Sequence, residues 1–296
     1  MPVHCAIEIP RLSQQQFGEV SYRVMNHVFA THREFGRLFD ERIYKQELAL
    51  RLPGIRLEVP VDVTHRTFLK RYFLDVVTAE GALFEFKTVE ELVRRHGAQL
   101  LNYLLLLDLS HGKLVNLRPT EVMHEFVNTT MTTAERRRFS VERRDFYAAS
   151  PGASALEGIV VPLLEDLGTG LELALYEEAM THLLGGESAV ERDVEVLSGD
   201  GTVLGAQRMR LCAAGAAFKF TTFSDPPPTF AEHCRRLLRH LPLDAVQWVN
   251  IATHKVTMAT LRKTRGTAEK FGAEILFKEP PPRQASHQMS PPIFLP

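Results

Sequence analysis

The two halves of this chain repeat each other, and this repetition is the feature that most constrains the fold. Residues 35–48, "FGRLFDERIYKQEL", share glycine and tyrosine positions with residues 167–180, "LGTGLELALYEEAM", at an offset of 132. Further along, "LVNL" at 114–117 corresponds to "WVNI" at 248–251, at an offset of 134. Nearly the same offset over about a hundred residues predicts two tandem copies of one domain, each long enough to bury its own core.

The apolar periodicity of the first copy predicts alternating groups of helices and strands. Apolar residues recur every three or four positions in the stretches expected to be helical, and short β-rich runs separate them. The expected helices are 13–35, 39–52 and 89–107, and the expected strands are 55–63, 70–78, 82–88, 112–117 and 122–128. The order α-α-β-β-β-α-β-β predicts an α/β fold with a mixed central sheet flanked by helices.

Breaks in composition suggest where the copies begin and end. The stretch around 147–155 is rich in small residues, with proline and glycine, as in a linker. We therefore expect a first domain at 1–147, a second copy at 155–278, and a disordered or loosely docked proline-rich tail at 279–296.

Composition excludes several classes of protein. The net charge of −1 neither requires nor excludes a polyanionic partner, so any such binding must come from local patches. The three cysteines lie far apart without a C-x-x-C pair, which argues against a disulfide framework or a zinc knuckle and fits a reducing cytoplasm. The start shows no signal-peptide pattern, and the most apolar run, residues 100–109, is too short to cross a bilayer. We expect a cytoplasmic protein without membrane contact.

One expected strand, "ALFEFKT" at 82–88, carries two charges among apolar residues. Glu85 and Lys87 are two positions apart, so they share a face of the strand. A hairpin at Gly81 would lay the preceding strand alongside and bring Asp75 close to Glu85. The ordinary alternative is an edge strand with a solvated face.

Carboxylates that gather in an apolar setting need a neutralising partner. Burying like charges together is costly, and a divalent cation removes that cost. Two carboxylates with a backbone carbonyl and waters form an oxygen site suited to Mg²⁺ or Mn²⁺. Such a metal activates water against a phosphodiester, and a lysine beside it orients that water or offsets negative charge. A third carboxylate, Glu41, lies one helical turn before Tyr44.

The helix after the charged strand offers further polar side chains. Gln99 and Tyr103 are four residues apart and therefore share a helical face, where they point toward the same site or form an ordinary polar stripe. Arg94 and Arg95 precede them and are candidates for phosphate contacts, against the alternative of a solvated helix start.

Together these segments resemble the PD-(D/E)XK nuclease superfamily and, more specifically, its GxxExxY family. Leu38 stands three residues before Glu41, where that family has glycine, while Gly36 keeps a glycine in the turn. The resemblance covers about residues 13–130. It is carried by Glu41-x-x-Tyr44, Asp75, Glu85-x-Lys87 and Gln99-x-x-x-Tyr103.

The resemblance implies a restriction-endonuclease-like core and a role for each motif residue. Asp75, Glu85 and the backbone carbonyl of Phe86 would bind Mg²⁺ or Mn²⁺, Lys87 would assist catalysis, and Glu41 would support the metal site. Gln99 and Tyr103 would order the site, and the expected contacts to nucleic acid come from Gln99, Tyr103, Arg94, Arg95 and Tyr44.

The second copy lacks the charged set. At the two offsets, the positions of Glu41, Asp75, Glu85, Lys87, Gln99 and Tyr103 are taken by Leu173, Met209, Lys219, Thr221, His233 and Leu237. The sequence thus predicts a metal-dependent nuclease, acting on nucleic acid with DNA favoured, whose second copy is inactive. The alternatives are a non-catalytic scaffold that binds nucleic acid or a partner, and a purely structural interaction protein. Either a homodimer or an intramolecular pseudo-dimer is compatible with the repeat.

Overall fold

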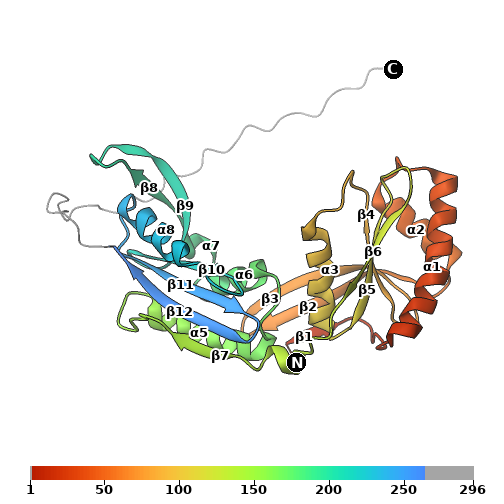
Figure 1. Ribbon diagram of the computed structural model, residues 1–296, viewed down its shortest axis with the longest axis horizontal. Helices are drawn as coiled ribbons and strands as arrows, with labels where there is room; N and C mark the ends of the chain where they lie inside the picture. The colour runs from red at the N-terminus through yellow and green to blue at the C-terminus, as the bar shows by residue number, and fades with distance from the viewer. Residues whose placement is uncertain (1, 264–296) are drawn as a thin grey trace, which may run out of the picture. The chain divides into compact units, whose positions relative to one another are not determined.

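The computed structural model describes residues 2–263, which contain two mixed β-sheets and their helices (Figure 1). The expected proline-rich tail at 279–296 and the end of the second domain at 278 lie outside the described residues.

The first sheet has six strands in the order β1-β2-β3-β4-β5-β6. Neighbouring strands are antiparallel except β4 and β5, which are parallel and are connected through a helix. This arrangement confirms the expected mixed sheet, although β1 was not expected from the sequence. The strands are β1 (Val3–Cys5), β2 (Arg56–His65), β3 (Phe68–Val77), β4 (Leu83–Lys87), β5 (His111–Asn116) and β6 (Met123–Asn128).

Three helices accompany this sheet: α1 (Gln14–Phe35), α2 (Glu41–Arg51) and α3 (Arg94–Leu107). Ser13 caps α1 with its side chain. The expected start of the third helix at 89 is wrong by five residues. The Val89 amide donates to the Asn116 side chain at 3.1 Å, and that side chain donates to the Val89 carbonyl at 2.7 Å. Both backbone groups of Val89 are therefore bonded to the end of β5 and not within a helix.

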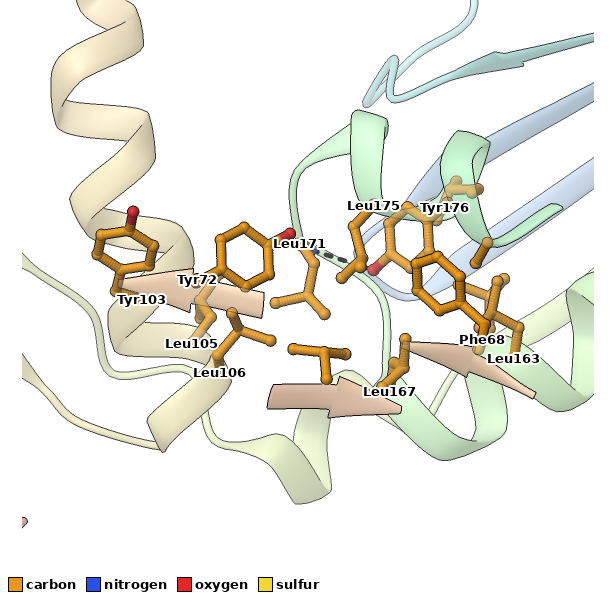
Figure 2. Close-up of a cluster of buried hydrophobic side chains, with 14 of the residues drawn as sticks. Phe68, Tyr72, Tyr103, Leu105, Leu106, Leu163, Leu167, Leu171, Leu175 and Tyr176 are labelled. Atoms are coloured by element: carbon orange, nitrogen blue, oxygen red, sulfur yellow. Dashed lines mark hydrogen bonds between the residues drawn. The ribbon is translucent and has the colours of Figure 1, made fainter. Parts of the chain in front are cut away.

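The helices cover opposite faces of the sheet. Phe17 and Val24 of α1 pack with Phe84 and Phe86 of β4 on one face. On the other face, α3 packs in a larger cluster that extends into the second half of the chain (Figure 2). Figure 2 shows side chains of β3 and α3 beside those of residues 163–176, including Phe68, Tyr72, Tyr103, Leu163, Leu167, Leu171 and Tyr176. The two halves therefore share this cluster, while each half also has a separate buried cluster of its own.

The second sheet also has six strands, in the order β7-β12-β11-β10-β9-β8. Its strands are β7 (Ser140–Arg143), β8 (Glu191–Leu197), β9 (Val203–Ala213), β10 (Ala216–Thr221), β11 (Ala245–Ala252) and β12 (Lys255–Arg262). From β8 to β12 the pairings are antiparallel, antiparallel, parallel and antiparallel, the same series as from β2 to β6.

The helices of the second half follow a similar order. Two helices precede β8 and one lies between the two parallel strands, with the short α4 and α7 added. They are α4 (Thr133–Arg136), α5 (Ala153–Leu167), α6 (Leu173–Leu183), α7 (Glu187–Val190) and α8 (Pro228–Arg239).

The chain enters the second sheet before the expected linker. Strand β7 lies within the range expected for the first domain, yet it pairs in parallel with β12. Just before it, the buried Arg136 donates hydrogen bonds to the carbonyls of Leu105, Leu167 and Thr169, at 2.8 to 3.0 Å. These contacts bind residues around 136 to both halves.

Among the described helices, none is both long and apolar enough to cross a membrane.

Candidate active site

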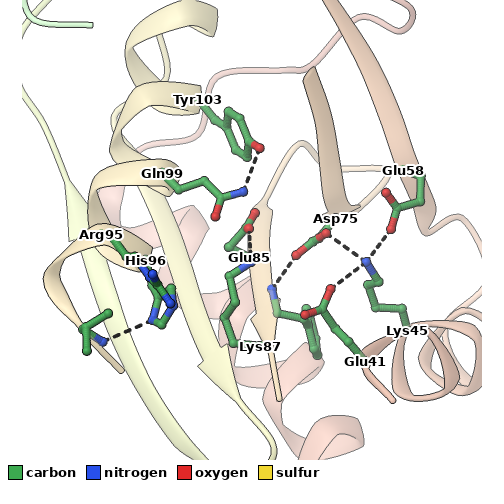
Figure 3. A network of polar contacts seen from close by, with 12 residues as sticks. Glu41, Lys45, Glu58, Asp75, Glu85, Lys87, Arg95, His96, Gln99 and Tyr103 are labelled. Carbon is green, nitrogen blue, oxygen red and sulfur yellow. Dashed lines mark hydrogen bonds and ion pairs between the residues drawn. The ribbon is translucent and has the colours of Figure 1, made fainter. Parts of the chain in front are cut away.

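The hairpin between β3 and β4 brings Asp75 and Glu85 to the same place (Figure 3). The register pairs Val76 with Phe84, so the next position along places Asp75 beside Glu85. Gly81 makes the turn possible with a φ of 100°, and a Cβ there would lie 2.3 Å from the Pro10 carbonyl oxygen. The hairpin expected at this glycine is therefore present.

Glu85 is the most buried carboxylate of the site, with 1% of its surface exposed. The Lys87 ammonium lies 2.5 Å from Glu85 Oε1, while the buried Glu85 Oε2 has no hydrogen-bond partner. Burial, and secondly the negative charge of Asp75, raise the pKa of Glu85 to about 8. A buried, unpaired carboxylate oxygen beside a second carboxylate is a position that a cation would stabilise.

Lys45 of α2, which the sequence analysis did not single out, neutralises the other carboxylates. Its ammonium lies 3.0 Å from Glu41 and 2.8 Å from Asp75, and it also pairs with Glu58 of β2. Burial alone would lower the pKa of Lys45, but hydrogen bonds to Asp75 and Glu58 outweigh burial and raise it. The only sequence signal was the Glu41-x-x-x-Lys45 spacing, which is common on helix surfaces.

The backbone near Lys45 carries a local constraint. Glu58 adopts a φ of 51°, which is unfavourable for a residue other than glycine. The conformation occurs within β2, at the residue whose carboxylate pairs with Lys45. Burial, followed by the charge of Asp75, raises the pKa of Glu41, the remaining member of this cluster.

The polar pair on α3 lies on the Lys87 side of the site. The Gln99 amide donates a hydrogen bond to the Tyr103 hydroxyl at 3.0 Å, as Figure 3 shows. Both residues line a cavity of about 470 Å³. Its other lining residues are Tyr72, Lys87, Arg95, His96 and Glu172.

Two other residues named from the sequence lie elsewhere. Arg94, the first residue of α3, is exposed and is not among the residues that line the cavity, whereas Arg95 is. Tyr44 is 1% exposed, and its hydroxyl donates to the Gly36 carbonyl at 2.7 Å and accepts from the Phe39 amide at 3.3 Å. Its contacts hold the turn before α2.

The residues present fit a divalent cation whose protein ligands are two carboxylates and one backbone carbonyl. Within residues 2–263, no cluster of three or more His, Cys, Asp or Glu side chains is arranged to hold a metal. The expected ligand set needs only two carboxylates and the Phe86 carbonyl. The Glu85 oxygen that has no hydrogen-bond partner is available to bind an ion. Asp75 already accepts hydrogen bonds from Lys45 and from the Phe86 amide, at 2.8 Å each, so it would share its oxygens with an ion.

The second half differs at the corresponding place. At the positions that the sequence offset aligns with Asp75 and Glu85, the second half has Met209 and Lys219, which line a cavity of about 370 Å³ with Leu237. The buried Thr221, where Lys87 would be, donates to Asn250 at 2.7 Å and accepts from the Trp248 indole at 2.9 Å. The aligned positions therefore carry an exposed lysine and a buried threonine that is hydrogen-bonded to two neighbours.

Part of the chain is similar to a known protein family. Residues 18–128 match the family model of the PD-(D/E)XK nuclease superfamily. No curated protein matches the chain, and no solved structure does. The matched range contains every motif residue from Glu41 to Tyr103, and this superfamily generally comprises metal-dependent nucleases.

Proposed function

We propose that this protein is a metal-dependent nuclease that hydrolyses phosphodiester bonds of DNA, using Mg²⁺ or Mn²⁺. One observation carries the proposal: Asp75, Glu85 and Lys87 lie together around a buried carboxylate oxygen without a partner. The match of residues 18–128 to the nuclease superfamily supports it. The Glu41-x-x-Tyr44 motif on α2 supports the narrower placement in the GxxExxY family.

Each residue can be given a part in the reaction. Asp75, Glu85 and the Phe86 carbonyl would hold the metal, which when bound supplies an activated water and stabilises charge on the phosphate. The charge and hydrogen bond of Glu85 raise the pKa of Lys87 against the opposing effect of burial, so Lys87 is an ammonium that donates toward developing negative charge. Gln99 and Tyr103 form the adjoining wall that orients the bound strand.

We further infer that the chain is a tandem duplication, with catalysis confined to the copy built on strands β1 to β6 and an inactive second copy built on β7 to β12. The same series of strand directions in both sheets supports the duplication. The replacement of both carboxylates by Met209 and Lys219 supports the loss of metal binding in the second copy.

One observation favours a second candidate, a non-catalytic nucleic-acid-binding scaffold. Both Asp75 oxygens already have hydrogen-bond partners within the protein, Lys45 and the Phe86 amide. If Asp75 keeps these partners and binds no metal ion, the site remains a charged surface that binds nucleic acid without hydrolysing it.

The experiment is cleavage of single-stranded and double-stranded DNA with Mg²⁺ or Mn²⁺, comparing the wild type with Asp75→Ala and Lys87→Ala. Lys219→Ala is the matched control, because it removes an exposed charge at the corresponding position of the second copy. We expect cleavage by the wild type and by the control only. Cleavage that persists in both first-copy variants would rule the proposal out, and binding without cleavage would favour the scaffold.

A further inference from the structure

The ring of His96 is held in one tautomer at the start of α3. The Val93 amide donates a hydrogen bond to Nδ1 of this ring at 3.1 Å, which a dashed line marks in Figure 3. A ring nitrogen that accepts a hydrogen bond carries no proton, so in the neutral imidazole the proton lies on Nε2. Burial, and secondly the positive charges of Arg95 and Lys87, lower the pKa of His96 and favour this neutral form.

The Nε2 proton of His96 has no acceptor among the residues that the structure describes. His96 is buried, with 6% of its surface exposed, and it lines the cavity of about 470 Å³ beside Lys87. The polar atom within hydrogen-bond distance of Nε2 is Nε of Arg95, at 3.4 Å. Arginine Nε is always a donor, and the Val93 bond makes His96 Nε2 a donor as well. Two donors directed at one place require an acceptor that the protein does not supply.

The other polar groups of the cavity do not supply that acceptor. The Tyr103 hydroxyl already accepts from Gln99 at 3.0 Å, so its own proton is directed elsewhere. Burial raises the pKa of Tyr103 to about 12, so this hydroxyl stays a donor. The Glu172 carboxylate accepts from the Tyr72 hydroxyl at 2.6 Å and from the Lys70 ammonium at 3.0 Å, so its charge is already neutralised.

A cavity with this set of groups selects an anion whose oxygen atoms only accept hydrogen bonds. Lys87 and Arg95 supply charged donors, and His96 and Tyr103 supply neutral ones. A phosphodiester oxygen fits, because it carries negative charge and accepts from both kinds of donor. Lys87 belongs both to this cavity and to the group around Glu85, so a DNA strand bound at the candidate active site has a phosphate within reach of the cavity.

We propose that His96 donates a hydrogen bond from Nε2 to a phosphate oxygen of the bound DNA strand, and that the same oxygen accepts from Arg95. Because the ring is neutral, this contact fixes the position of one oxygen and adds no charge. The proposal rests on the proposed nuclease function and adds a residue that touches the substrate.

Nitrogen NMR of protein with labelled histidines tests the tautomer and the contact directly. The signals of His96 are assigned by their absence from the His96→Asn protein. We expect a proton on Nε2 in the free protein, and a changed chemical shift of Nε2 when a short thymidylate oligonucleotide is added with a chelator, so that no cleavage occurs. A proton on Nδ1, or an Nε2 shift that stays unchanged when the oligonucleotide binds, overturns the proposal.

His96→Asn separates the two hydrogen bonds of the ring. The asparagine carbonyl can accept from the Val93 amide as Nδ1 does, but its side chain ends before the position of Nε2. We therefore expect an unchanged midpoint of urea denaturation and an affinity for the oligonucleotide about tenfold lower by fluorescence anisotropy, the loss that one hydrogen bond to a charged group predicts.

His182→Asn is the matched control and should keep the wild-type affinity. His182 is exposed, lies 3.2 Å from the Thr67 hydroxyl and does not line the cavity. Wild-type affinity in His96→Asn, or a wild type that does not bind the oligonucleotide, overturns the proposal. A loss of affinity accompanied by a loss of stability also overturns it, because His96 would then act only through the start of α3.

The result is separable from the question of catalysis. Weaker binding by His96→Asn, together with a wild type that cleaves no DNA under Mg²⁺ or Mn²⁺, would support the phosphate contact and refute the nuclease. Cleavage by the wild type, together with unchanged binding by His96→Asn, would support the nuclease and refute the role of His96.

Discussion

Tyr44 and Tyr176 make the same two hydrogen bonds in the two halves of the protein. Each hydroxyl donates to a glycine carbonyl at 2.7 Å, that of Gly36 or Gly168, eight residues earlier. Each also accepts from a backbone amide five residues earlier, at 3.3 and 3.1 Å. The two sequence matches at an offset of 132 therefore correspond to one structural device, a tyrosine that fixes the turn between two helices.

Replacing these tyrosines with phenylalanine should destabilise the protein unequally. Tyr176→Phe leaves a buried amide and a buried carbonyl without partners, and we expect a loss of about 2 kcal/mol in the free energy of unfolding. The contacts of Tyr44 are only partly buried, so Tyr44→Phe should cost about 1 kcal/mol. Urea denaturation measures both. Equal losses, or a larger loss at Tyr44, would contradict the expectation.

Lys45 should hold the acidic cluster together when no metal is bound. Lys45→Met leaves Glu41, Glu58 and Asp75 without their cation, and we expect the free energy of unfolding to fall by roughly 3 kcal/mol. Added Mn²⁺ should raise the melting temperature of this variant by more than it raises that of the wild type. Lys70→Met, which removes a lysine paired with Glu172 and Glu178, is the control and should show no gain in the Mn²⁺ response. Equal responses in both variants would show that metal and Lys45 do not share this site.

Glu85 should make stability depend on pH in the absence of metal. Its pKa is raised to about 8 by burial and by Asp75, so the folded protein binds a proton that the unfolded chain releases above its ordinary pKa near 4.5. The stability of the wild type should therefore decrease as pH rises from about 4.5 to about 8. Glu85→Gln removes this dependence and should be more stable than the wild type at pH 8 by about 2 kcal/mol. Chemical denaturation across this pH range measures the free energy of unfolding of both proteins. If this free energy changes with pH in the variant as it does in the wild type, Glu85 is not the cause of the dependence.

Local pattern was enough to predict much of the fold. The helix expected at 13–35, the Gly81 hairpin and the mixed sheet follow from periodicity and turn chemistry, and the charged strand pointed to Asp75, Glu85 and Lys87. The late start of α3 was missed because Asn116, distant in sequence, binds Val89. Lys45 and Glu172 were missed for the same reason. Their partners come from separate elements, and the Glu172 amide binds Asn102, 70 residues away.

The Gly81 turn that aligns Asp75 with Glu85 should tolerate no side chain. Gly81→Ala places a methyl group 2.3 Å from the Pro10 carbonyl oxygen at a φ of 100°, and we expect a loss of roughly 2 kcal/mol or more in the free energy of unfolding. Gly18→Ala is the matched control, because nothing lies within 4 Å of the added carbon on α1 and alanine favours a helix, so this variant should gain about 1 kcal/mol. Because the strain acts on the hairpin, Gly81→Ala should also weaken Mn²⁺ binding, measured by calorimetry under conditions where the variant is folded. Unchanged Mn²⁺ affinity in a destabilised Gly81→Ala protein would show that the turn supports the fold without setting the distance between the two carboxylates.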